Sequence, residues 1–511
     1  MLRRLRPLLW PAAGVLLVAL FLLGLARLHH PVYGFTTLLQ FDDSNPAWLP
    51  EVRERPAFIN HYSGGYDGLY YAQLACRPLL RDPALAQAVE NLPYRARRIL
   101  ASWVAWALAG GNPTRALDAY ALINPLCWLA LAGLLWAFFP LRSFHDLLAW
   151  AGLLFSAGAL ASVRLALTDL PALLLLAAAM LAVQRGRLHG AVGFLAAAGL
   201  TRETSLLSAP LLIRDSARST FLRGLAIVTP LALWLIYIRL VVGPDVTGWG
   251  GLAWPGAAWL EKGRATVATL GQPGLAWLGW TTLLAFIGLT VQAGWLLLRP
   301  QWGSLWWRFG VGHAGLLLLL GPVIWEGFPG AATRVLLPLN LAFNALAPRT
   351  RAGLALLVLG NLTVPAGLLE FTRLPNDGVE LAAVRAEPAA VLVQTHSGWF
   401  GVERDAHNFW AWSGGEAELR VVALPAGTTQ DLSFQLRSLA PCTVEVAQTG
   451  RVLWRGSLGP GWRAINLSCA DGPLTFHSDR PPVRESSASD ARALAFCIAQ
   501  VRISGVSAAR N

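Results

Sequence analysis

Residues 8–25 have the sequence LLWPAAGVLLVALFLLGL, which contains no charged side chain in 18 consecutive positions. A helix rises about 1.5 Å per residue, so roughly 20 apolar residues cross the hydrocarbon core of a bilayer. This stretch therefore predicts a membrane-spanning helix. A cleaved signal peptide is the alternative, but it would have a shorter apolar run followed closely by a small-residue cleavage site.

The composition of the whole chain agrees with a membrane protein. Of its 511 residues, 55% are hydrophobic and 14% are charged, and the mean hydropathy is +0.48, values that soluble globular proteins rarely reach. The formal charge of +12 comes from arginines scattered in short clusters between apolar runs. Because they form no continuous basic stripe, we expect membrane lipids and phosphate groups as partners and no nucleic acid.

About eleven apolar stretches are candidate spans of a polytopic α-helical membrane domain, which we place at residues 1–374. An alternating count cannot put all the arginine-bearing linkers on one side, so we expect a half-span or re-entrant helix. The best candidates are 99–110 and 189–213, because Thr201-Arg202-Glu203-Thr204 places costly charges within the second. The stretches are 8–25, 99–110, 117–139, 147–163, 168–183, 189–213, 221–242, 275–298, 306–325, 332–347 and 352–370.

The orientation follows from the arginines at the N-terminus. Arg3, Arg4 and Arg6 precede the first span, which predicts a cytoplasmic N-terminus and a first extracytoplasmic loop at residues 29–98. With an odd number of spans, the region after residue 375 lies on the same side as that loop.

Residues 375–511 have a different pattern. Short alternating runs such as Glu418-Leu419-Arg420-Val421-Val422 are separated by Gly, Pro, Asp and Ser, which predicts an antiparallel all-β, jelly-roll-like sandwich. Trp399, Trp410 and Trp412 either stack on sugar rings or belong to the core of this sandwich. Cys442 and Cys469 either form a disulfide or are buried free thiols.

The first loop contains the most suggestive motif, Gly65-Tyr66-Asp67-Gly68-Leu69-Tyr70-Tyr71. Asp67 lies at an expected loop-to-helix junction, and Tyr70 and Tyr71 open an amphipathic helix that we expect on the bilayer surface. A carboxylate in this place acts either as a helix cap or as a general base for a hydroxyl group.

This motif resembles the first-loop motif of bacterial GT-C-type membrane glycosyltransferases. It is similar to the Trp-Asp-Gly-x-x-Tyr pattern of GPI-anchor mannosyltransferases, with Tyr66 in place of the tryptophan. Further stretches resemble the same group and cell-surface glycopolymer formation proteins: Tyr94-Arg95-Ala96-Arg97-Arg98-Ile99-Leu100, Leu167-Thr168-Asp169-Leu170-Pro171-Ala172, Thr201-Arg202-Glu203-Thr204 and Thr333-Arg334-Val335-Leu336-Leu337-Pro338.

The resemblance implies an inverting transfer of a sugar from a polyprenyl-phosphate donor to a glycan, lipid or protein acceptor of the cell envelope. The enzyme would reside in the bacterial inner (cytoplasmic) membrane, and Asp67 becomes the leading candidate for the base, with Asp42 and Asp43 as competitors. Arginine suits the leaving phosphate because its planar fork binds oxygens in pairs. We expect Arg202, Arg334, Arg97 and Arg98 to bind the donor phosphate, with Tyr66, Tyr70, Tyr71, Asp169 and Glu203 nearby.

Several alternatives stay open. Arg202 can instead pair with Glu203 or Asp169 as intramembrane structure, and Asp169 can be a helix cap before Pro171. No metal-ligand spacing is present, so no cofactor is expected, although some GT-C enzymes use a divalent metal. The whole chain could also be a transporter or flippase of lipid-linked glycans, or a non-catalytic glycan-binding assembly factor. A transporter should show internal repeats, which we do not find.

Overall fold

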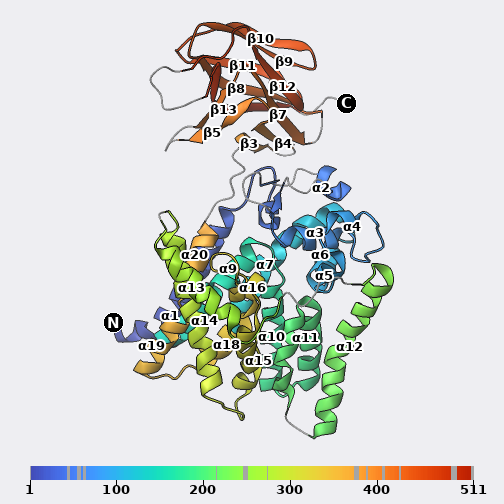
Figure 1. The fold of residues 1–511 in the computed structure, drawn as a ribbon, viewed down its shortest axis with the longest axis vertical. Helices are drawn as coiled ribbons and strands as arrows, with labels where there is room; N and C mark the ends of the chain where they lie inside the picture. The colour runs from blue at the N-terminus through green and yellow to red at the C-terminus, as the bar shows by residue number, and fades with distance from the viewer. Residues whose placement is uncertain are drawn as a thin grey trace. The chain divides into compact units, whose positions relative to one another are not determined.

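The computed structural model describes residues 2–507 apart from 43–46, 55–58, 61–64, 214–215, 245–250, 273, 373–378, 387–388, 405–408, 425–426 and 485–491. The chain divides into two compact units (Figure 1). The first comprises residues 1–28, 35–57 and 65–374 and is helical; the second comprises 29–34, 58–64 and 375–511 and contains an antiparallel β domain.

Among the described residues of the first unit, four helices are long and apolar enough to cross a membrane: the part of α1 (Leu2–Ala26) from Leu8 onward, α7 (Pro113–Leu135), α12 (Ala217–Val241) and α14 (Ala276–Leu298). Two bent pairs raise the number to six if each pair is one span. They are α8 (Phe144–Leu154) with α9 (Ala157–Arg164) and α19 (Arg351–Gly360) with α20 (Val364–Thr372), each bent by 41°. By length and hydropathy, these helices are the candidate membrane spans of the described residues.

The expected count of about eleven spans is wrong for the part of the chain that the structure describes. Several of the apolar stretches form helices that are too short to cross a bilayer at 1.5 Å per residue. They include α6 (Leu100–Leu108), α10 (Asp169–Gln184), α11 (Leu188–Thr201), α15 (Leu305–Leu319) and α18 (Leu337–Leu346). Stretch 189–213 ends in a 3₁₀ segment, η2 (Glu203–Leu212), because the helix stops at Thr201 before the charged pair.

Shorter elements complete the first unit and lie largely before α7. They are η1 (Thr36–Leu39), β1 (Phe41–Asp42), α2 (Pro50–Glu54), α3 (Gly68–Cys76), α4 (Leu85–Ala88), α5 (Leu92–Ala96), α13 (Ala257–Leu270), α16 (Pro322–Trp325) and α17 (Ala332–Val335). Strand β2 (Ile59–Asn60) lies in the second unit.

Close helix packing and buried amides hold the bent pairs in place. An added Cβ at Gly367 would lie 2.7 Å from the Phe155 carbonyl oxygen, so α20 packs directly on the break between α8 and α9. Asn361 donates to the Asn344 side chain at 2.9 Å, and Asn344 donates to the Ala149 carbonyl at 2.9 Å. Buried amides of this kind must be paired, and here they join α18, α19 and α8.

The β domain consists of two antiparallel sheets. The six-stranded sheet has the order β10-β9-β12-β7-β4-β3, and the five-stranded sheet has the order β11-β8-β13-β6-β5. The strands are β3 (Glu380–Ala386), β4 (Ala389–Thr395), β5 (Trp399–Arg404), β6 (Phe409–Ser413), β7 (Glu416–Leu424), β8 (Thr429–Ser438), β9 (Cys442–Gln448), β10 (Arg451–Leu458), β11 (Arg463–Cys469), β12 (Gly472–Ser478) and β13 (Phe496–Ser507). The structure therefore confirms the prediction that the C-terminal region is an antiparallel all-β domain with two sheets.

Aromatic side chains from both sheets form the core between them. Phe476 of the first sheet contacts Phe434 and Phe496 of the second, with ring centroids 6.0 and 6.1 Å apart. Cys442 and Cys469 are buried free thiols, so the second of the two alternatives describes them and the disulfide is not formed. They lie on β9 and β11, strands of different sheets, and behave as small core residues.

The segment 29–34 packs with the β domain within the second unit. His30 Nε2 lies 2.7 Å from a Glu380 carboxylate oxygen, and the Gln394 amide donates to the Tyr33 hydroxyl at 2.8 Å. Tyr33 is buried against Leu392. The beginning of the predicted first loop therefore contributes to the core of the second unit.

We expect Phe476→Ala to destabilise the β domain by about 3–5 kcal/mol, because it removes a fully buried ring and leaves a cavity. Phe476 is 2% exposed, whereas Phe400 is 44% exposed. Phe400→Ala is the matched control and should cost less than about 1 kcal/mol. Thermal unfolding of the purified full-length chain, followed by circular dichroism in the β region, measures both; equal effects would contradict this description of the core.

Candidate functional site

Asp67 lies at the start of helix α3, at the N-cap position, but its side chain makes no capping hydrogen bond. Its neighbour Gly68 explains the helix position: an added Cβ would lie 2.3 Å from the Leu165 carbonyl oxygen. Only glycine allows this approach, which brings the start of α3 against the turn after α9. Because the Asp67 carboxylate makes no capping hydrogen bond, it does not act as a cap of α3.

Helix α3 is packed inside the protein, which differs from the exposed amphipathic helix that was expected. Eight of its nine residues are buried, and Tyr70 alone is half-buried. In the structure α6 and α7 pack against α3, and buried Gln73 donates to the Ala88 carbonyl at 2.9 Å, so protein satisfies the polar face as well.

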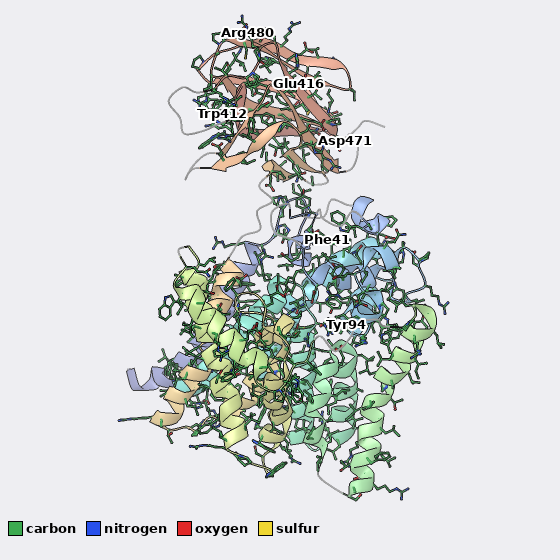
Figure 2. All side chains as sticks on the ribbon, in the orientation of Figure 1. Phe41, Tyr94, Trp412, Glu416, Asp471 and Arg480 are labelled. Atoms are coloured by element: carbon green, nitrogen blue, oxygen red, sulfur yellow. The ribbon has the colours of Figure 1, made fainter. Side chains whose placement is uncertain are left out.

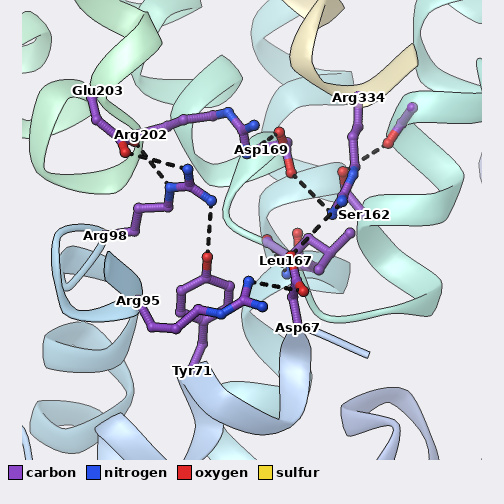
Figure 3. Close-up of polar contacts among 12 residues, drawn as sticks. Asp67, Tyr71, Arg95, Arg98, Ser162, Leu167, Asp169, Arg202, Glu203 and Arg334 are labelled. Atoms are coloured by element: carbon purple, nitrogen blue, oxygen red, sulfur yellow. Dashed lines mark hydrogen bonds and ion pairs between the residues drawn. The ribbon is translucent and has the colours of Figure 1, made fainter. Parts of the chain in front are cut away.

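The Asp67 carboxylate faces two guanidinium groups. Its Oδ1 lies 2.9 Å from Arg95 Nη1, and its Oδ2 lies 3.8 Å from Arg334 Nη2. The Asp67 side chain is 23% exposed, so it is open to a ligand while the two arginines beside it are more deeply buried. Figure 3 shows Asp67 and Arg95 pointing toward each other.

Tyrosines line this acid and its arginines. Arg334 Nη2 donates to the Tyr66 hydroxyl at 3.0 Å, and the Arg334 guanidinium carbon lies 5.1 Å from the Tyr66 ring centroid. Arg95 lies over Tyr70 at 4.9 Å. Burial raises the pKa of Tyr66, with Arg334 acting in the opposite direction. Tyr66 therefore stays a neutral phenol whose proton can be donated to an oxygen in the site.

Asp169 lies deeper and faces two arginines as well. It is the first residue of α10, and the N-cap residue is Thr168, so Asp169 is not the cap itself. Its side chain is 1% exposed; Oδ1 lies 2.5 Å from Arg202 Nη1 and Oδ2 lies 3.9 Å from Arg334 Nη1. Arg334 thus lies within ion-pair distance of both Asp67 and Asp169.

Close backbone packing places Arg334. An added Cβ at Gly158 of α9 would lie 2.3 Å from the Thr333 carbonyl oxygen and 2.8 Å from the Arg334 Cα. Helix α17 can approach α9 this closely because Gly158 has no side chain. The two helices therefore hold the Arg334 guanidinium in the space between α3 and α10.

A third ion pair borders the same region. Arg98 Nε donates to a Glu203 oxygen at 3.0 Å, and Arg98 also donates to the Tyr71 hydroxyl at 3.1 Å (Figure 3). Arg98 donates to the Tyr94 hydroxyl at 3.1 Å as well; Tyr94 lies on α5 and is labelled in Figure 2. Glu203 is therefore the partner of Arg98, and Arg202 is the partner of Asp169.

We call the seven charged residues that these five ion pairs join the polar cluster: Asp67, Arg95, Arg98, Asp169, Arg202, Glu203 and Arg334. Four guanidinium groups and three carboxylates give it one net positive charge in the fully ionised state. The Nε atoms of Arg95, Arg202 and Arg334 are buried and have no hydrogen-bond partner in the described part of the chain. Such buried donors are normally paired, so each of these three arginines has one donor left over beside its ion pairs; both Asp169 carboxylate oxygens likewise lack a hydrogen-bond partner there.

The other expected site residues lie differently. Arg97 is half-buried with its guanidinium 5.6 Å from the Tyr94 ring, outside the polar cluster. Asp42 is buried, and its carboxylate accepts a hydrogen bond from the Gly65 backbone, so it supports the loop before Asp67. Asp43 lies outside the described residues.

Sequence reasoning gave no site role to Arg95, although it contacts Asp67. The signal was the spacing within Tyr94-Arg95-Ala96-Arg97-Arg98, since residues three apart face the same side of a helix and Arg95 and Arg98 are so spaced. No three His, Cys, Asp or Glu residues within the described ranges come together as a possible metal site.

The tryptophans of the β domain are packed. Trp412 is buried under the Arg437 guanidinium, and Trp399 contacts the Phe476 and Phe496 rings. Trp410 is half-buried and donates to a Glu403 oxygen at 2.9 Å. Each indole therefore has at least one protein partner.

We expect Gly68→Ala to lower the melting temperature of the protein, because the new methyl group must displace α3 from the Leu165 carbonyl. Overpacking of this kind typically costs about 1–3 kcal/mol. Gly133→Ala on α7 is the matched control, since an added Cβ there meets nothing within 4 Å. The control should be neutral or slightly stabilising. An equal melting temperature for the two variants would contradict the close approach.

Comparisons with known proteins give no family for this chain. No family model matches it, and no curated protein matches it. Among solved structures, one described as "CBM4 structure and function" has 10% sequence identity and a TM-score of 0.15, and the match covers 25% of this chain and 99% of that chain. A similarity of this size carries no argument about fold or function.

Proposed function

We propose that this protein is a membrane glycosyltransferase that moves a sugar from a polyprenyl-phosphate donor to a cell-envelope acceptor. The observation that carries the proposal is the position of Asp67, a partly exposed carboxylate next to Arg95 and Arg334, whose Nε donors have no hydrogen-bond partner among the described residues. A transfer from a phosphate leaving group needs a base for the incoming hydroxyl and cations for the outgoing phosphate. The polar cluster offers both within one region.

In the proposed step, the acceptor hydroxyl loses its proton to the Asp67 carboxylate while its oxygen forms the new bond to the anomeric carbon. The bond between that carbon and the donor phosphate oxygen breaks, and its electron pair leaves with the phosphate. Arg334 and Arg202 stabilise the added negative charge, and the Tyr66 hydroxyl can donate a further hydrogen bond. A single displacement inverts the configuration at the anomeric carbon.

The same proposal includes the type of fold, the role of the β domain, the cellular location and the membrane topology. They are a GT-C-type membrane domain, a jelly-roll-like β domain that contacts glycan, residence in the bacterial cytoplasmic membrane, a cytoplasmic N-terminus and an extracytoplasmic site. They are supported by the motif resemblance, by the apolar helices long enough to span a membrane, and by the arginines that precede α1.

The test uses the full-length protein in lipid vesicles with a panel of radiolabelled polyprenyl-phosphate sugars and cell-envelope acceptors. Appearance of label in the acceptor, together with free polyprenyl phosphate, supports a glycosyltransferase. Movement of intact lipid-linked sugar across the vesicle membrane with no release of polyprenyl phosphate would instead identify a flippase. Neither transfer nor movement with any donor would leave the assembly-factor alternative and overturn the proposal.

A further inference from the structure

Four helices of the first unit, α1, α8, α19 and α20, enclose an apolar groove of about 740 Å³ that is separate from the polar cluster. Leucines and phenylalanines make up half of its lining residues, among them Leu20 and Leu368, which are 51% and 44% exposed. Exposed leucines on helices long enough to cross a membrane face lipid and not water. The groove therefore opens toward the hydrocarbon of the bilayer.

The length of the groove corresponds to one leaflet. Its lining on α1 runs from Leu17 to Arg27, which is about 15 Å of helix at 1.5 Å per residue. The hydrocarbon core of a bilayer is about 30 Å thick. Leu17 is the middle residue of the candidate span Leu8–Ala26, and Arg27 follows its end. The groove thus extends from the membrane centre to one headgroup layer.

The polar side chains that line the groove are hydrogen-bonded within the described part of the protein, except for Arg27, whose charge can contact a ligand. Asn361 donates to the Asn344 side chain and the Leu357 carbonyl, and the Thr372 hydroxyl donates to the Leu369 carbonyl. Arg27 is exposed at the headgroup end, and no acidic side chain of the described residues forms an ion pair with it. The site has an apolar wall with a single positive charge at its interfacial end.

We propose that this groove binds an anionic glycerophospholipid, with an acyl chain along α1 and the phosphate at Arg27. Length and charge both favour this ligand: an acyl chain ends within its own leaflet, as the groove does, whereas a polyprenyl chain is much longer. A basic side chain at the headgroup level favours anionic over zwitterionic lipid. This lipid site goes beyond the proposed function and does not depend on it.

A bound lipid would also pack against the bend that positions Arg334. Gly152 and Phe155 line the groove, and Gly158, three residues after Phe155, contacts the Thr333 backbone. The lipid and the polar cluster therefore share the break between α8 and α9 as a common support.

The experiment is native mass spectrometry of the full-length protein released from vesicles that contain equal amounts of phosphatidylglycerol and phosphatidylcholine. We expect one retained phosphatidylglycerol, favoured roughly fivefold over phosphatidylcholine, as one interfacial arginine predicts. Arg27→Gln should make the two lipids equal, and Leu20→Trp should reduce retention of both. Leu368→Trp fills the groove from the α20 wall and gives the same readout if Leu20→Trp fails to fold.

Two variants serve as controls. Arg239→Gln removes a basic residue from the last turn of α12, and Leu22→Trp enlarges a side chain of α1 that is 43% exposed and does not line the groove. Both should retain phosphatidylglycerol as the native protein does. Equal retention of the two lipids by the native protein, or an unchanged ratio in Arg27→Gln, would overturn the proposal. Displacement of phosphatidylglycerol by an equal amount of undecaprenyl phosphate would also overturn it and assign the groove to the polyprenyl lipid.

Discussion

Replacing Asp67 by asparagine is expected to lower the rate of sugar transfer by about 10²–10⁴-fold, the range that removal of a general base produces. Asparagine has the size of aspartate and can still accept a hydrogen bond from Arg95, but it cannot take a proton from the acceptor hydroxyl. The measurement is the kcat of transfer with a labelled polyprenyl-phosphate sugar. The KM for the donor should stay the same or fall, since the polar cluster becomes more positive without the Asp67 carboxylate.

Two other acids of the same loop provide the comparison for Asp67. Asp82→Asn changes an acid that pairs with Arg77 at 3.1 Å and touches no residue of the polar cluster, so transfer should stay normal. Asp42→Asn keeps an oxygen that accepts from the Gly65 backbone, and its effect should be small. Loss of transfer in Asp42→Asn with normal transfer in Asp67→Asn would assign the base to Asp42.

The membrane helices show what hydropathy alone can predict. Residues 8–25 formed a candidate span because α1 is apolar on every side, and that prediction agrees with the length of the helix. Residues 168–183 looked equally apolar, yet α10 has 16 residues and 11 of them are buried. Side chains that face lipid and side chains that face other helices are both apolar, so hydropathy cannot separate the two environments. The excess in the predicted number of spans arises because such apolar helices inside the protein, α10 among them, are too short to cross a bilayer.

For the polar cluster, the sequence indicated most of the residues but not how they pair. Arg202 was identifiable because ionised side chains are costly in apolar surroundings, and Asp67, Asp169 and Arg334 were identifiable because their motifs resemble those of GT-C-type enzymes. Their pairing was not, since Arg334 and Asp67 are far apart in the sequence and are brought together by the close approaches at Gly68 and Gly158. Glycine contacts of this kind depend on the tertiary fold, which no local pattern contains.

Arg334→Gln is expected to reduce kcat by about 10²–10³-fold, the loss that follows removal of one group that stabilises charge in the transition state. Arg334 is the one arginine of the polar cluster within ion-pair distance of both Asp67 and Asp169 among the described residues. It can therefore orient the candidate base and bind the leaving phosphate at the same time. Arg334→Lys should recover only part of the activity, because lysine has the charge but lacks the planar fork.

Arg349→Gln is the matched control for Arg334, since it breaks an ion pair with Asp146 at 2.7 Å outside the polar cluster. Its kcat should equal that of the native protein. A structural role of Arg334 would lower the melting temperature and leave kcat per folded molecule unchanged, whereas a role in the reaction lowers kcat in protein that melts normally. If Arg334→Gln transfers sugar at the native rate, the leaving phosphate is bound elsewhere, and Arg202, Arg95 and Arg98 are the next arginines to replace. The dependence of each variant on donor concentration then separates donor binding from stabilisation of the leaving group.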